Sequence, residues 1–402
     1  MWELIRANQR RSNLLMGAMG VLLLATGWAV GETVFAAPVP GVLVAAGLWL
    51  VQSEVALRSG HKLLMLVSRA RPVSKQDHPI LFNVVEEMSV ASGLPRPPEV
   101  YILDEDAPNA FAAGMGPERA AVAVTAGLLE RLTRDELQGV IAHEISHIKH
   151  RDVRYLTLMA VMAGSVVILA DFARRVLFFG GVRRRTSANQ RGAAPIYLVA
   201  LVLILIAPLV ARLMYLALSR RREFLADAGA AAATRYPEGL ASALEKIERY
   251  WSPMANANPA TAPMFIVNPL VNPLAAVETL FSTHPPTAQR VRILRSLAGT
   301  VSFAAFDQAF RQVTGRPVGV VPAAALRQES VPVRQPSSDP RTALDRLRQT
   351  TDLLWRLGGY SFIPCPCGTT LKVPPIYRGQ TLPCPHCATP HPVVAPASSP
   401  QA

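Results

Sequence analysis

The stretch Val140–Asp152, VIAHEISHIKHRD, is the part of the sequence around which the rest can be placed. It holds His143, Glu144 and His147 in the spacing H-E-x-x-H. On a helix the two histidines lie one turn apart on one face, so an imidazole nitrogen of each can bind the same metal ion. The neighbouring carboxylate of Glu144 can then take a proton from a water molecule on that metal. The spacing predicts a catalytic zinc site, and the alternative is a chance match on a polar helix.

The residues before this stretch predict that it lies on a helix. Thr133-Arg-Asp-Glu136 has the pattern of a capping box, in which the threonine hydroxyl and the glutamate side chain each bond the other residue's backbone. A helix is therefore expected to begin near Arg134 and to carry both histidines in its later turns. Further upstream, the apolar spacing predicts an amphipathic helix over Pro79–Gly93. The strands expected in this part of the chain are Glu99–Leu103 and Ala120–Thr125.

The composition of the 402-residue chain points to a membrane. Half of the residues are apolar and the mean hydropathy is positive, which is unusual for a water-soluble protein. The formal net charge is +13, which suits either nucleic acid or an anionic membrane leaflet, and the long apolar runs favour the leaflet. All four cysteines lie between Cys365 and Cys387, so no disulfide framework is expected in the main body.

The N-terminal region is expected to form a hairpin of two membrane helices. An arginine-rich start precedes the apolar run Leu14–Val30, and a second apolar stretch, Pro38–Val51, follows at once. The first run alone would also suit a signal peptide, but its length and the second stretch argue against cleavage. The loop 31–40 has no Lys or Arg, whereas basic residues follow the second run. This charge bias predicts that residues 58–152 lie in the cytoplasm.

A second apolar hairpin is expected over residues 155–218. Its helices would be Tyr155–Ala170 and Pro195–Leu218, and the loop between them is rich in arginine. If both helices span the bilayer, this loop lies outside, against the positive-inside tendency; a re-entrant hairpin would keep it inside. Spanning is favoured because the second helix is long and almost wholly apolar. In both cases the two ends of the hairpin lie on one side of the membrane.

A third zinc ligand is expected just after this hairpin. Glu223 starts a helical segment on the same side of the membrane as the two histidines, and Asp227 follows one turn later. Asp227 could hydrogen-bond a ligand imidazole and fix its tautomer. The alternative for Glu223 is a solvated carboxylate paired with Arg220–Arg222. A further amphipathic helix is expected over Pro237–Tyr250.

The four cysteines predict a zinc ribbon near the C-terminus. Cys365-Pro-Cys367 and Cys384-Pro-His-Cys387 are two knuckles that can bind one structural zinc ion tetrahedrally. The alternative is four free or redox-active thiols. The ribbon carries few basic residues, so we expect it to contact protein or hold the tail and expect no nucleic-acid partner.

With these motifs in place, the chain resembles the HtpX-like membrane zinc metallopeptidases, relatives of the CAAX prenyl proteases. The resemblance covers roughly residues 10–297 and rests on motifs in the family's order. The motifs are Asn109–Gly114, AAVAVT with the TAGLL that follows, His143–His147, Arg222–Asp227, and Thr283–Pro286 with Arg290. The extension 299–402 is not explained by it.

The resemblance implies a gluzincin site with one catalytic Zn²⁺; the structural Zn²⁺ of the ribbon is expected separately, from the spacing of the cysteines. The residues that the resemblance assigns are His143, His147 and Glu223 as zinc ligands, Glu144 as base and then acid, Asp227 as the partner of a ligand, His284 near the oxyanion, and Asn109 and Ala110 against substrate backbone. An extended substrate is expected to add to the sheet edge at Ala120–Thr125.

The expected fold is mainly α: an α+β zincin-type (gluzincin) catalytic domain with about four transmembrane helices and a small β zinc ribbon. The expected parts are a membrane hairpin (1–57), the first catalytic half (58–152), a second membrane hairpin (153–218), the second catalytic half (219–298), a linker (299–358) and the ribbon (359–392). A short helix is expected within the linker, over Leu344–Leu357.

The resemblance implies a multi-pass protein of the bacterial inner membrane whose active site faces the cytoplasm. Its expected partners are the lipid bilayer and polypeptide substrates, with misfolded or membrane proteins in quality control as the substrate class. Two rival functions remain open. One is a membrane zinc-binding scaffold without catalysis, although the intact Glu144 argues against it. The other is a regulator that acts through the ribbon.

Overall fold

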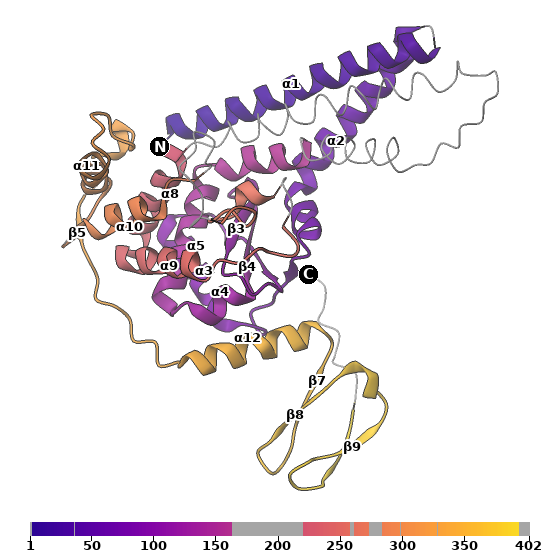
Figure 1. Cartoon of the computed structure of the whole chain (residues 1–402), viewed down its shortest axis with the longest axis vertical. Helices are drawn as coiled ribbons and strands as arrows, with labels where there is room; N and C mark the ends of the chain where they lie inside the picture. Colours follow the sequence, from indigo (N-terminus) through magenta and orange to yellow (C-terminus); the bar gives the residue numbers. More distant parts are fainter. Residues whose placement is uncertain are drawn as a thin grey trace.

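The computed structural model describes residues 2–35, 37–162, 220–257, 261–272, 284–297, 299–327 and 329–393. It has a mostly helical body with a four-stranded sheet and a small two-stranded one, β5 (Thr300–Val301) with β6 (Val331–Pro332). A long helical hairpin projects from one end of this body, and two small β-hairpins project from the other (Figure 1).

The N-terminal hairpin consists of α1 (Trp2–Phe35) and α2 (Pro38–Val67). The two helices approach closely at Gly27, where a Cβ atom would lie 2.5 Å from the carbonyl oxygen of Gly41. Among the described residues, α2 is the one helix long and apolar enough to cross a membrane. The apolar side chains that it exposes include Val39, Leu43, Val44, Leu48, Leu50 and Val51. The second expected hairpin falls mostly on residues 163–219, which lie outside the described residues.

The larger sheet of the body has four strands: β1 (Arg71–Pro72), β2 (Glu99–Leu103), β3 (Ala110–Gly116) and β4 (Arg119–Thr125). Their order is β1-β2-β4-β3, with β2 parallel and β3 antiparallel to β4. The two expected strands are confirmed. However, β4 lies inside the sheet, so the expectation that Ala120–Thr125 forms the open edge is wrong. β3 turns back directly before β4 and takes the edge position, and alternation of side chains alone cannot distinguish an edge strand from an inner one.

Helices pack against the sheet and against one another, and the helix that carries His143 and His147 lies among them (Figure 1). They are α3 (Pro79–Ser92), α4 (Ala126–Arg131), α5 (Arg134–Lys149), α8 (Arg220–Thr234), α9 (Pro237–Arg249) and α10 (Thr287–Arg295). The capping box at Thr133 and Glu136 is present, which confirms the expected start of α5. Fourteen of the 16 residues of α5 are buried, so this helix forms part of the core.

The stretch 299–358, expected as a linker, is folded against the body. It contains α11 (Phe303–Thr314) and α12 (Ala343–Leu357), of which the second confirms the expected short helix. Phe306 and Phe310 are buried, and the Phe310 ring lies 5.0 Å from that of Phe224. The linker prediction is wrong for α11 because its three phenylalanines recur at helical spacing and face the core.

The strap, which we define as residues 333–342, runs between these helices along the outside of the body (Figure 1). It reaches the first turn of α5, where Arg334 and the backbone N–H of Ser337 each donate to the Asp135 carboxylate at 2.7 Å. Asp339 accepts from the backbone N–H of Arg134 at 3.0 Å.

The chain then forms two hairpins. The first pairs β7 (Ser361–Pro364) with β8 (Thr370–Val373), and the second pairs β9 (Thr381–Pro383) with β10 (Pro390–Pro392). Each hairpin carries one cysteine pair.

Candidate active site and metal centres

Two buried histidines from the later turns of α5 face each other. The Nε2 atoms of His143 and His147 lie 3.2 Å apart. Each ring is held by a carboxylate at its other nitrogen: Nδ1 of His143 lies 3.0 Å from Asp227, and Nδ1 of His147 lies 3.1 Å from Asp152. Because a carboxylate accepts, we assign the Nδ1 proton to both rings, which leaves both Nε2 lone pairs pointing into the same space.

Glu223 closes this space from the neighbouring helix α8. One of its oxygens lies 3.6 Å from Nε2 of His147 and the other 3.8 Å from Nε2 of His143. The helices can approach because residue 229 is glycine: a Cβ there would lie 2.3 Å from the hydroxyl of Ser146 on α5. The three groups expected as ligands are therefore together, with ligand atoms within 4.8 Å of one another.

The spacing of these donors fits zinc. Two nitrogens bound tetrahedrally at Zn–N distances near 2.0–2.1 Å lie about 3.3 Å apart, close to the separation of the two Nε2 atoms. Two facing lone pairs repel unless a positive charge lies between them. The surroundings favour such a charge: burial opposes a charged His147, but Asp152 and Glu223 outweigh it and raise its pKa to about 9. Burial lowers the pKa of His143 to about 4. A metal cation would supply this charge.

Glu144 lies in the same cavity as the two histidines and Glu223. Its side chain is buried, and burial raises its pKa to about 7; the charge of His147 and a backbone hydrogen bond from Ala112 act in the opposite direction. A carboxylate with a pKa near neutrality can both accept and return a proton. The position and protonation of Glu144 therefore suit a general base.

Asp227 is held by a buried arginine. Nε and Nη2 of Arg290, on α10, donate to its two oxygens at 2.8 and 2.7 Å. Burial would raise the pKa of Asp227, but the charge of Arg290 outweighs it and keeps this pKa below the usual value. Asp227 thus stays ionised beside His143. Arg290 belongs to one of the sequence motifs, but its role could not be predicted, since no spacing rule links it to Asp227.

His284 also joins the cluster. Its Nδ1 lies 3.0 Å from an oxygen of Glu223. Burial of Glu223 is outweighed by the charge of His284 and by this hydrogen bond, so the pKa of Glu223 lies well below its usual value. Asp152, whose carboxylate contacts Nδ1 of His147, was not predicted to have a role, although it lies at the end of the stretch Val140–Asp152.

Residues 265–267 cover the edge of β3 that faces away from β4. The backbone N–H of Ile266 donates to the carbonyl oxygen of Ala110 at 3.0 Å, and the side-chain amide of Asn109 donates to the carbonyl oxygen of Val267 at 2.7 Å. Asn109 and Ala110, expected against substrate backbone, thus bond the chain's own backbone. The cavity beside Glu144 measures only about 10 Å³, which is room for one water molecule. The site is closed.

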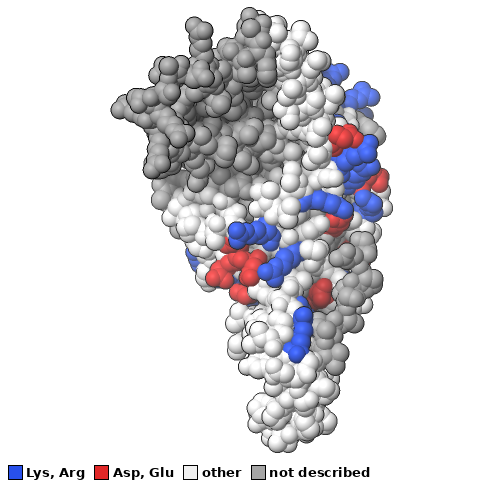
Figure 2. Space-filling view, turned by 90° about the vertical axis from the view of Figure 1, so that its right-hand side faces the viewer, with Lys and Arg blue, Asp and Glu red and all other residues white. Residues whose placement is uncertain are grey.

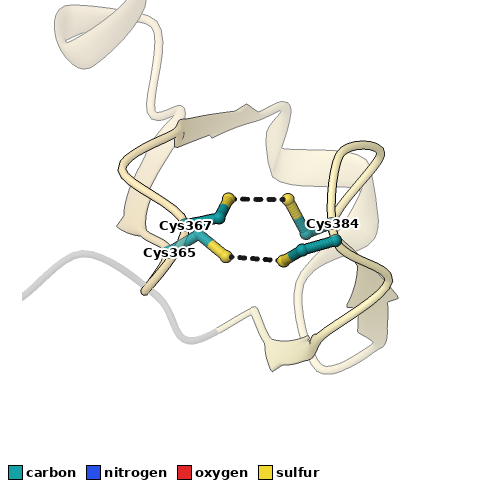
Figure 3. Close-up of side chains that lie close together, drawn as sticks. Cys365, Cys367 and Cys384 are labelled. Atoms are coloured by element: carbon teal, nitrogen blue, oxygen red, sulfur yellow. Dashed lines mark hydrogen bonds between the residues drawn. The ribbon is translucent and has the colours of Figure 1, made fainter.

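The four cysteines form a second cluster (Figure 3). The Sγ atoms of Cys365 and Cys387 lie 3.4 Å apart, and those of Cys367 and Cys384 lie 3.8 Å apart. These distances exclude disulfides. Four thiolates on one zinc ion at 2.3 Å lie about 3.8 Å from one another, so this donor set also fits zinc. The short first knuckle closes through Gly368, whose φ is +87°.

The chain is similar to known proteins. Residues 75–298 match the model of peptidase family M48. The chain is 44% identical over 296 residues to the protease HtpX homolog of Dictyoglomus turgidum, which covers 74% of this chain and 94% of that protein. It is 41% identical over 296 residues to the protease HtpX homolog of Thermococcus sibiricus, covering 73% and 97%.

Among solved structures, the chain is similar to the crystal structure of S. mikatae Ste24p. The TM-score is 0.39 and the identity 19%, over 73% of this chain and 67% of that one.

Proposed function

The chain belongs to peptidase family M48 as an HtpX homologue, and from this premise we propose that it is an integral-membrane zinc endopeptidase. We assign His143, His147 and Glu223 as zinc ligands and Glu144 as the general base. The observation that carries the assignment is the pair of facing Nε2 atoms, 3.2 Å apart, with a carboxylate closing the third side. A scaffold without catalysis would need no buried base beside this space.

Zinc held there supplies a Lewis acid that acidifies water and polarises the scissile carbonyl. Glu144 takes the proton of the attacking water and then passes it to the leaving nitrogen. Asp227 and Asp152 keep both imidazoles in the tautomer whose Nε2 is free. His284 contacts Glu223 through its Nδ1 atom. We propose that its side chain turns toward the oxyanion once substrate is bound.

Substrate would bind along β3 in place of residues 265–267. A peptide in this position would pair with the backbone of Ala110 and with Asn109, and backbone pairing gives little sequence preference. The contacts of residues 265–267 support this order of events, because a peptide cannot bond Ala110 and Asn109 while Ile266 and Val267 do. Low sequence preference suits a broad class of unfolded or misfolded membrane proteins, the substrate class that we propose.

We further propose a multi-pass protein of the bacterial inner membrane, with four spans and the active site toward the cytoplasm. The exposed apolar face of α2 supports a bilayer contact, and the basic residues after it support this orientation. The second pair of spans would be formed by residues 155–218. The domain limits predicted from the sequence stay a proposal, except that residues 299–358 are folded and are not a linker.

A second zinc ion is proposed on the four cysteines, which would make the two C-terminal hairpins a structural zinc ribbon. Figure 2 shows few charged side chains at the lower end of the molecule, where these hairpins lie. Of the ribbon's basic residues, Lys372 pairs with Asp352 at 2.6 Å. This surface favours a protein contact over nucleic acid.

Zinc stoichiometry of the purified full-length protein tests both assignments. The wild type should hold two zinc ions, of which His143→Ala loses one and Cys384→Ser loses the other. A single zinc ion that persists in His143→Ala would contradict the peptidase proposal.

A further inference from the structure

One side chain links the first helix of the N-terminal hairpin to the metal-binding end of α5. The amide nitrogen of Asn8, on α1, lies 2.7 Å from Oδ1 of Asp152 and 3.0 Å from the carbonyl oxygen of His150. Asn8 is 5% exposed and Asp152 is 1% exposed, so both bonds are shielded from water. An NH₂ group has two hydrogens and can serve both acceptors at once.

The other oxygen of the same carboxylate faces a proposed zinc ligand. Oδ2 of Asp152 lies 3.1 Å from Nδ1 of His147, whose Nε2 faces His143. A carboxylate turns about a single bond, so a donor that holds one oxygen fixes the direction of the other. Asn8 therefore sets the direction in which the Asp152 carboxylate points toward Nδ1 of His147.

The second bond of Asn8 acts on the backbone that places Asp152. His150 is the C-cap of α5, and the next residue, Arg151, has a φ of +59°. This left-handed conformation is unfavourable for a residue with a side chain and needs support from its surroundings. The bond to the His150 carbonyl oxygen holds this turn against α1.

We infer that Asn8 is a positioning residue of the metal centre: through Asp152 it holds His147 in the orientation that zinc requires. The centre is then complete only when α1 is docked on the end of α5. The inference rests on the proposed function, since it gives Asn8 a role toward the same zinc ion. Loss of a group that supports a metal-bound imidazole lowers metal affinity or activity by about 10–100-fold.

Two variants of the full-length protein test the role of Asn8. Asn8→Leu removes both donated hydrogen bonds with little change of volume. Asn8→Asp keeps the shape but sets a second carboxylate against Asp152. Asn13→Ala is the matched control, because Asn13 lies exposed on the same helix and contacts Arg154 at 3.5 Å.

Zinc affinity is measured by competition with a chelator, and the zinc on the cysteines serves as an internal reference. We expect the affinity of the histidine site to fall about 10–100-fold in both Asn8 variants, more in Asn8→Asp, and to stay unchanged in Asn13→Ala. Peptidase assays should show a lower kcat with little change in KM. Equal zinc affinity in Asn8→Leu and Asn13→Ala would overturn the inference.

A double variant separates positioning from a general loss of stability. In an Asp152→Asn background the link to His147 is already weakened, so adding Asn8→Leu should lower zinc affinity by much less than it does alone. Two losses that simply multiply would overturn the inference. If Asn8→Leu does not fold, the isosteric Asn8→Asp carries the comparison.

The outcomes also separate the inference from the proposed function. If His143→Ala keeps both zinc ions, the proposed function fails. If His143→Ala loses one ion and the Asn8 variants keep wild-type affinity, only the role of Asn8 is wrong.

Discussion

Arg290→Met tests whether the buried ion pair behind His143 supports the metal centre. Arg290 is 1% exposed and Asp227 is fully buried, and two hydrogen bonds join them. Methionine fills part of the space but leaves a buried carboxylate without its cation. Breaking a buried pair on one side costs about 3–5 kcal/mol of folding free energy. Asp227 would then draw a second proton onto His143 or become protonated itself, and either change weakens zinc binding, by about 10–100-fold.

The matched control is Arg295→Met on the same helix. Arg295 pairs with Glu238 and Glu245 at the surface, where its side chain is 44% exposed, so its removal should cost at most about 1 kcal/mol. Thermal unfolding in detergent and chelator competition for zinc measure the two effects. Adding Asp227→Asn to Arg290→Met should recover part of the stability, because no charge then stays buried. If Arg290→Met is no less stable than Arg295→Met and binds zinc as tightly, the reasoning is refuted.

Three other predictions follow from the site. Glu144→Gln should keep both zinc ions, and its peptidase rate should fall about 10²–10⁴-fold. Full activity would show that Glu144 is not the general base. Cys384→Ser should lose one zinc ion and leave the zinc affinity of the histidine site unchanged in chelator competition; a loss of both ions would contradict two separate sites. Phe265→Ala removes the ring that packs 4.7 Å from Phe111, so it should loosen residues 265–267 and raise kcat/KM for short unfolded peptides. A lower kcat/KM with unchanged zinc would show that this segment does not block substrate.

Local patterns predicted the elements that carry the proposed zinc ligands. The capping box at Thr133 predicted the start of α5, and the H-E-x-x-H spacing predicted that His143 and His147 share one face of it. Glu223 was proposed because it follows an apolar stretch that is expected to return the chain to the same side. These features depend on residues close in sequence or on one topological argument.

Arg290 and the edge position of β3 could not be predicted, because both depend on residues far apart in sequence. Arg290 reaches Asp227 from a different helix, and no period or spacing connects them. The edge position of β3 likewise depends on how the strands pair rather than on which residues form them. The packing of α11 depends in the same way on a distant partner, since Phe310 meets Phe224 of another helix.

The strap connects the C-terminal hairpins to the body, so it would transmit a force applied to them. α12 packs on α4, with Arg346 donating to the carbonyl oxygen of Glu130, and the strap before it grips Asp135 at the start of α5. The hairpins therefore have a mechanical connection to the helix that bears His143 and His147, and a force on them would act on the first turn of this helix. Residues beyond the family-matching region thus hold one end of this helix in place.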